Sequence, residues 1–138
     1  MANQQFGHVT GGVRALLRVE GAVIFAAATA AYFVDGGAWW LYLVLFLAPD
    51  LAFLAYPAGE RIGAMVYNGL HTVTVPLVLL LGGWVGAQDI LVHVALIWLA
   101  HIGIDRAVGY GLKYPSGFGH THLGPMGKAK RAAPSMPS

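Results

Sequence analysis

The sequence of 138 residues contains no cysteine and few charged side chains. The lack of cysteine excludes disulfide bonds, cysteine-based zinc sites and a thiol nucleophile, so any metal would have histidine, carboxylate or amide ligands. Asp, Glu, Lys and Arg make up 10% of the residues, against ~25% in soluble domains. Because a soluble chain of this size must cover a large surface with polar groups, this composition argues against a soluble globule.

The excess of positive over negative charge is also small. The formal net charge is +2, and three of the eight cations (Lys128, Lys130 and Arg131) lie near the C-terminus. A short basic run of this kind is typical of a solvated tail or of the cytoplasmic side of a membrane protein. The sequence therefore predicts a lipid bilayer as the partner of this chain, and no nucleic acid.

Apolar residues make up 57% of the chain and are concentrated in four long segments. These segments cover residues 13–34, 38–56, 62–81 and 90–110. Each is about as long as a helix that crosses a ~30 Å hydrocarbon layer, where the backbone must satisfy its own hydrogen bonds. The sequence predicts an all-α integral membrane protein, a four-helix up-down-up-down bundle over residues 13–110.

The distribution of Lys and Arg predicts the orientation. The first and third connections contain only Asp35 and Asp89 as charged residues, whereas Arg61 lies in the second connection. The other cations lie near the two ends of the chain. By the positive-inside rule, we expect a multi-pass protein of the cell (inner) membrane with both termini cytoplasmic.

Three segments remain outside the predicted helices. Residues 1–12 are expected to form an N-terminal cytoplasmic segment. Residues 111–124 are rich in Gly and aromatic side chains and are expected to lie at the membrane interface. Residues 125–138 are small, basic or Pro and are predicted to form a disordered tail.

Several polar side chains occur inside the predicted spans, where one ionised group costs about 2.5–3.5 kcal/mol at the bilayer centre. They are Glu20, Asp50, Asn68, His71, His101, Asp105 and Arg106. Because of this cost, we expect these side chains to face one another or a wet cavity, with Arg106 or Arg18 neutralising at least one acid.

The spacing of four of these residues predicts a common depth. Glu20 and Asp50 are equally far from the first connection, and His71 and His101 are equally far from the third. In antiparallel helices such residues lie at one level, here in the cytoplasmic half of the bilayer. In addition, His101 and Asp105 share a helix face because they are four residues apart.

Histidine and carboxylate groups contributed by several helices are the usual ligands of metal centres in bundles. The candidate ligands of a divalent metal are Glu20, Asp50, His71, His101 and Asp105. Two alternatives stay open. The layer could belong to a structural or accessory protein and only fix helix packing, or to a subunit of a small homo-oligomeric proton or ion transporter. The sequence identifies no catalytic residue, so whether the chain is an enzyme also stays open.

Five short motifs are together similar to those of a known family. They are LLRVEG (16–21), FLAPDL (46–51), YNGLHT (67–72), HIGIDRAVGYGLKYP (101–115) and THLG (121–124). The chain resembles an uncharacterised bacterial membrane family, the domain of unknown function 4260, over roughly residues 14–124. The resemblance implies four short spans and no established activity. The chain differs from the family's pattern at His120, where an acidic residue is common.

Overall fold

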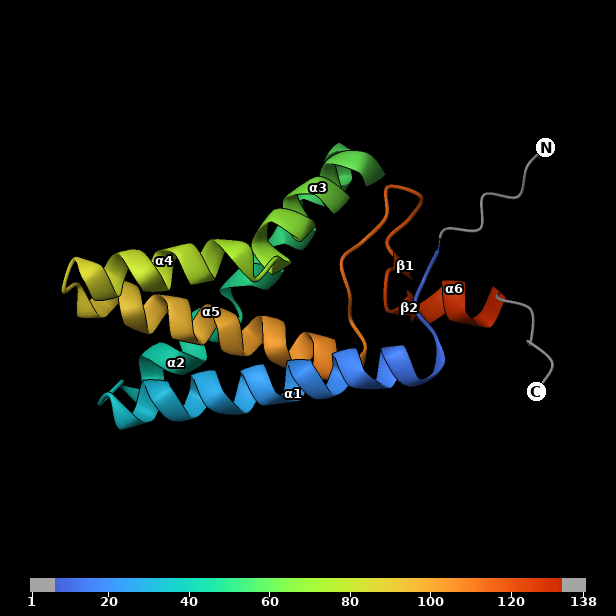
Figure 1. The fold of residues 1–138 in the computed structure, drawn as a ribbon. Helices are drawn as coiled ribbons and strands as arrows, with labels where there is room; N and C mark the ends of the chain where they lie inside the picture. Colours follow the sequence, from blue (N-terminus) through green and yellow to red (C-terminus); the bar gives the residue numbers. More distant parts are fainter. Residues whose placement is uncertain (1–6, 133–138) are drawn as a thin grey trace.

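The computed structural model describes residues 7–132, so the ends of the predicted terminal segments (1–6 and 133–138) lie outside the described residues. Four helical segments are long and apolar enough to cross a membrane, which confirms the predicted class of an α-helical membrane protein. They are Gly11–Val34, Trp39–Ala58, Glu60–Val85 and Asp89–Val108. The first and last are the continuous helices α1 and α5, which lie side by side in Figure 1.

The second segment is broken in two. Helix α2 (Trp39–Phe46) ends before the 3₁₀ helix η1 (Ala48–Ala58) begins. Pro49 is the second residue of η1. In a continuous α-helix the ring of Pro49 would clash with the carbonyl of Leu45. Proline also has no backbone N–H group that could donate a hydrogen bond to this carbonyl. Pro49 therefore coincides with a change of helix type just before Asp50.

The third segment is also broken, although the sequence predicted one helix over residues 62–81. Helix α3 (Glu60–His71) ends at Thr72, whose backbone is extended at φ −84° and ψ 139°, and α4 (Thr74–Val85) follows. Pro76 lies in the first turn of α4, where a helix needs no N–H donor. An unbroken helix would have placed the Pro76 ring against the carbonyl of Thr72.

Helix α4 also continues to Val85, through residues that the sequence assigned to the third connection. Gly83 explains this extension, because a Cβ built on it would lie 2.8 Å from Cβ of Leu91. Without a side chain at this position, α4 can pack closely against α5. The connection is therefore short and lies between Val85 and Asp89.

Helix α5 is the centre of the fold and lies between α1 and α4 in Figure 1. Its residues Ala95, Ile97 and Ala100 are fully buried. At the crossing with α1 the two backbones are in contact. A Cβ built on Gly103 would lie 2.5 Å from the backbone nitrogen of Phe25, and a Cβ built on Gly21 would lie 2.8 Å from the carbonyl oxygen of Gly103. Small residues at such a crossing let membrane helices approach closely.

After α5 the chain folds back over the end of the bundle, beside the start of α1 (Figure 1). It forms a short antiparallel hairpin, β1 (His120–Thr121) and β2 (Gly124–Pro125), and a last helix, α6 (Gly127–Ala132). Residues 125–132, predicted as part of a disordered tail, thus include the second residue of β2 and the helix α6. The hydrogen bond from Met126 N to Gly119 O helps to hold them in place.

Candidate metal centre

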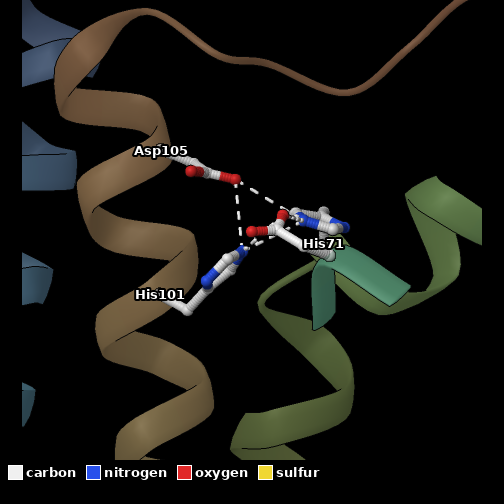
Figure 2. A group of neighbouring side chains, drawn as sticks. His71, His101 and Asp105 are labelled. Carbon is white, nitrogen blue, oxygen red and sulfur yellow. Dashed lines mark hydrogen bonds and ion pairs between the residues drawn. The ribbon is translucent and has the colours of Figure 1, made fainter. Parts of the chain in front are cut away.

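Four ionisable side chains from three parts of the chain meet between the helices. Asp50 comes from η1, His71 is the last residue of α3, and His101 and Asp105 are on successive turns of α5. One nitrogen or carboxylate oxygen from each lies within 4.8 Å of all the others. Figure 2 shows the side chains of His71, His101 and Asp105 pointing toward one another across the gap between α5 and α3.

The distances between these atoms are nearly equal. Nε2 of His71 lies 3.2 Å from Nε2 of His101. Oδ1 of Asp50 is 3.7 Å from the His71 nitrogen and 3.4 Å from the His101 nitrogen. Oδ2 of Asp105 is 3.5 Å and 3.4 Å from the same two atoms. Five of the six separations are thus 3.2–3.7 Å, and the sixth, between the two carboxylate oxygens, is at most 4.8 Å, so the four atoms form a compact, distorted tetrahedron.

A tetrahedral metal site has this shape and size. Ligands about 2.1 Å from a central ion are about 3.4 Å from one another, which lies inside the observed range. Direct hydrogen bonds between nitrogen and oxygen are shorter, at about 2.7–3.2 Å. All four contacts between histidine and aspartate here are 3.4–3.7 Å long. The spacing fits four ligands around a cation better than four partners in a hydrogen-bond network.

The orientation of His71 also suits a ligand. Its Nδ1 donates a hydrogen bond to the carbonyl oxygen of Tyr67 at 2.9 Å, so in the neutral ring Nε2 has a free lone pair. The ring of Tyr67 stacks on the imidazole, with centroids 3.7 Å apart and planes within 9°. The backbone and the ring of Tyr67 together fix the direction of the His71 lone pair.

His101 is held mainly by packing at its far side. Its Nδ1 is buried and makes no well-formed hydrogen bond among the described residues, although the backbone of Phe46 is close enough to interact with the ring. The ring of Phe46 contacts the imidazole edge-on at 5.4 Å, and the His71 ring lies against it at 5.2 Å. These contacts direct Nε2 of His101 toward the centre of the cluster.

The four ligands differ in exposure. The side chains of His71 and His101 are only 4% and 3% exposed, whereas Asp105 is 17% and Asp50 38% exposed. The imidazoles therefore form the buried side of the site, and Asp50 forms its more exposed side.

The breaks in the second and third segments position two of the ligands. Asp50 follows the break at Leu47, and His71 directly precedes the break at Thr72. Interrupted helices inside a membrane are tolerated where the freed backbone is buried in protein or lines a cavity. Here the interruptions bring ligands from two different helices onto the continuous face of α5.

Three of the four residues predicted to share one depth, Asp50, His71 and His101, do meet. The fourth, Glu20, does not, which corrects its assignment as a metal ligand. Glu20 is exposed because α1 turns the adjacent Gly21 toward α5. Glu20 instead lines a small cavity together with Arg106.

The two arginines predicted to neutralise an acid of the layer make no ion pair with Asp50 or Asp105, but Arg106 interacts electrostatically with Glu20, the third acid of that layer. Arg106 lies on α5 one residue beyond Asp105, but makes no ion pair with the cluster. Arg18 is exposed, and its Nε donates to the carbonyl oxygen of Ala107 at 2.8 Å. Within residues 7–132, the ion-pair partners of Asp50 and Asp105 are the two histidines.

Asn68 also lies outside the cluster. Its side-chain amide donates to the backbone oxygen of Lys113 at 2.8 Å and accepts from the backbone nitrogen of the same residue at 2.7 Å. It therefore ties α3 to the segment that follows α5. An amide side chain can satisfy both backbone groups of one residue, which explains why a polar residue occurs here.

Two polar features, one near the site and one at the other end of α5, were not predicted as functional. Lys113, 3% exposed, has Nζ 3.6 Å from the centre of the Phe118 ring and 4.7 Å from that of Tyr67, and donates to the Phe118 oxygen at 2.8 Å. Burial lowers the pKa of Lys113 to about 8. At the other end of α5, His93 lies 2.9 Å from Asp35. For a single polar residue in a loop or at a helix end, the sequence does not indicate which residue its side chain contacts.

The comparisons with known proteins agree with the motif resemblance. No curated protein and no solved structure matches this sequence. A family description without an assigned activity matches residues 14–126, which include all four ligands and the segment after α5. The chain therefore belongs to the family described as domain of unknown function (DUF4260).

Proposed function

We propose that this protein is an integral membrane metalloprotein that binds one divalent cation between Asp50, His71, His101 and Asp105. The observation that carries the proposal is the spacing of the four ligand atoms, five of whose six separations are 3.2–3.7 Å. The remaining pair, the two carboxylate oxygens, lies within 4.8 Å.

Electrostatics support a cation at this position. Two carboxylates lie close together beside two nearly unexposed imidazoles, and no Lys or Arg makes an ion pair with either acid in the described part of the chain. Buried like charges repel each other strongly unless a counter-charge is present. Either protons or a metal ion can supply it, and the compact spacing of the four atoms suits a metal ion.

The ligand set favours zinc or a similar ion. Imidazole and carboxylate ligands suit Zn²⁺ and the neighbouring first-row metals, and tetrahedral geometry suits Zn²⁺ best. Mg²⁺ and Ca²⁺ prefer six or more oxygen ligands, which this site does not offer.

The exposure of Asp50 supports a catalytic role as a second candidate function. If water displaces this carboxylate from the ion, His71, His101 and Asp105 remain as the three protein ligands typical of catalytic zinc sites. The ion would then lower the pKa of the bound water and make it a nucleophile for hydrolysis. A D50A protein that still binds metal, and in which Co²⁺ gives the spectrum of a water-containing site, supports this candidate.

We further propose that both termini face the cytoplasm and that the protein lies in the cell (inner) membrane. Arg61 follows the second span, and Arg14, Arg18 and Lys113 lie at the same end of the spans as the two termini. This distribution obeys the positive-inside rule and puts the cluster in the cytoplasmic half. A reporter fused after residue 138 is expected to be active only in its cytoplasmic form.

Metal analysis of the purified full-length protein tests the main proposal. We expect about one zinc-class ion per chain, loss of the ion on chelation, and a lower melting temperature until the ion is restored. A His101→Ala protein should bind no ion, while His93→Ala, which changes a histidine outside the cluster, should bind normally.

The opposite result separates the remaining interpretations. If the folded protein holds well under one ion per chain and added ions leave its melting temperature unchanged, the metalloprotein is excluded. Proton or ion flux in proteoliposomes would then support a transporter, and its absence would leave the cluster a structural element.

A further inference from the structure

A second site lies at the end of the bundle, away from the four ligands. A cavity of about 650 Å³ separates the start of α1 from the segment that follows α5. Its walls include the side chains of Arg14, His120 and Lys128 and the backbone of several glycines. No Asp or Glu is among the described residues that line it. The cavity is therefore bordered by positive charge without a negative counterpart.

Arg14 is the residue that points to a ligand. Its Nε is buried but has no hydrogen-bond partner, and the side chain makes no ion pair within residues 7–132. Leaving a buried guanidinium N–H without an acceptor is costly, and arginine side chains in proteins are normally paired. Arg14 also lines the cavity, so the other N–H groups of its guanidinium can bind an anion there.

The backbone of the segment after α5 packs closely around the guanidinium of Arg14. A Cβ built on Gly109 would lie 3.4 Å from Nη2 of Arg14, and one on Gly124 would lie 3.6 Å from the same atom. Both glycines have positive φ angles, +98° and +122°, which other residues rarely adopt. The loops after α5 thus curve around the guanidinium without placing a side chain on it.

We propose that this cavity binds a phosphate group, with Arg14 as its principal ligand and Lys128 as a second positive charge. A guanidinium binds phosphate through two parallel hydrogen bonds, and a nearby ammonium adds a point charge. The site lies where α1 begins and α5 ends, which is the level of the lipid headgroups for helices that span a bilayer. The phosphate can therefore belong to a lipid headgroup or to a soluble phosphate compound.

A simpler role for Arg14 is to reach the headgroup region as an anchoring cation. Such a residue keeps its charged end in water. Here Nε is shielded from solvent, and the guanidinium lies against the backbone of the segment after α5. A built cavity with an unpaired buried donor favours a specific site over a general anchor.

The test uses the full-length protein in a detergent with a neutral headgroup. Three probes are added separately: inorganic phosphate, phosphatidic acid and phosphatidylcholine. Binding and melting temperature are measured for the wild type, for Arg14→Gln and for Arg61→Gln. Arg61 is an exposed cation outside the cavity, so its variant controls for the loss of one charge.

We expect phosphatidic acid to bind and to raise the melting temperature of the wild type and of Arg61→Gln, while phosphatidylcholine has a much smaller effect. Arg14→Gln should bind roughly tenfold more weakly or worse. An equal response to inorganic phosphate identifies the phosphate group alone as the ligand, and a response to phosphatidic acid only identifies a lipid headgroup. Both results support the site.

Binding of neither phosphate probe, or equal weakening in the Arg14 and Arg61 variants, overturns the proposal. If Arg14→Gln does not fold, Lys128→Gln takes its place, and an unchanged affinity in that protein likewise overturns it. An Asp105→Asn protein keeps the cavity intact and should still bind the probe. Its response therefore separates a failure of this site from a failure of the metal centre.

Discussion

Nε2 of His71 lies 3.2 Å from Nε2 of His101, although the two residues are 30 positions apart in the sequence. The proton of the neutral His71 ring is on Nδ1, where it is bonded to the backbone of Tyr67. Its Nε2 lone pair is therefore directed at the second imidazole. Two histidines in this arrangement need a proton or a metal ion between them, and the two nearby carboxylates increase that need.

Removing one of these imidazoles should abolish metal-dependent stabilisation. A His71→Ala protein loses one of four ligands, so an excess of Zn²⁺ should no longer raise its melting temperature. In the wild type, Zn²⁺ at about 100 times its dissociation constant should stabilise the fold by about 2.7 kcal/mol. Thermal unfolding with and without the ion measures both effects.

His93→Ala is the matched control for this substitution. It also removes a histidine in contact with an acid, Asp35, but at the other end of α5. It should retain the full response to Zn²⁺. Equal responses of the His71 and His93 variants would contradict the assignment of the site.

Residue spacing predicted most of this cluster because helices have a fixed rise. Asp50 is as many residues from Asp35 in the first predicted connection as His71 and His101 are from Gly86 in the third, and at 1.5 Å per residue equal spacing becomes equal depth. Spacing does not determine which face of a helix turns inward. Glu20 has the correct depth but the wrong direction, because the contact between Gly21 and Gly103 sets the rotation of α1.

The breaks in the second and third segments were harder to predict. Pro49 and Pro76 are both visible in the sequence, and Pro49 coincides with the change of helix type in the second segment. The effect of Pro76 was missed, because a proline can be accommodated either by a kink or by the start of a new helix. The structure has the second outcome, with Thr72 extended and His71 at the helix end. Apolar composition alone cannot distinguish these two cases.

The crossing of α1 and α5 should tolerate no added methyl group. In a Gly103→Ala protein the new Cβ would lie 2.5 Å from the Phe25 nitrogen, so the helices must move apart. Such overpacking typically lowers the free energy of unfolding by about 1–3 kcal/mol. Because α5 carries His101 and Asp105, we also expect weaker metal binding. The free energy of unfolding in detergent and the affinity for Zn²⁺ are the measurements.

Gly69→Ala serves as the control for that substitution, since a Cβ at this helical position in α3 meets nothing within 4 Å. Alanine is favoured over glycine in helices by roughly 1 kcal/mol, so this variant should be neutral or stabilised. A Gly103→Ala protein as stable as Gly69→Ala would show that the two backbones are not in contact.

Asn68 should hold the segment after α5 in place. Asn68→Ala removes two hydrogen bonds to the backbone of Lys113, at 2.8 and 2.7 Å, and leaves both backbone groups unpaired. Losing these two hydrogen bonds should lower the free energy of unfolding by about 2–4 kcal/mol. Hydrogen exchange of the Lys113 amide should speed up greatly, while Gln88→Ala, which removes one local bond in a connection, should leave it unchanged. Slow exchange in the Asn68 variant would contradict this role.

The burial of Lys113 should make stability depend on pH in the alkaline range. Its pKa is about 8 in the folded protein and near 10.5 in an unfolded chain, mainly because burial disfavours the ammonium form. Between these values the unfolded chain binds more protons, so the free energy of unfolding should rise with pH. Below pH 8 both states carry the proton, and this lysine then contributes no pH dependence.

The contribution of this lysine is measured by comparing the wild type with Lys113→Met, because all other titrating groups are shared. As the pH rises from 8 to 10.5, the difference in stability should move in favour of the wild type by up to about 3 kcal/mol. Unfolding in detergent at several pH values gives the difference curve. A flat curve over this range would mean that Lys113 is solvated, and that the rings of Phe118 and Tyr67 do not enclose its ammonium group as the structure shows.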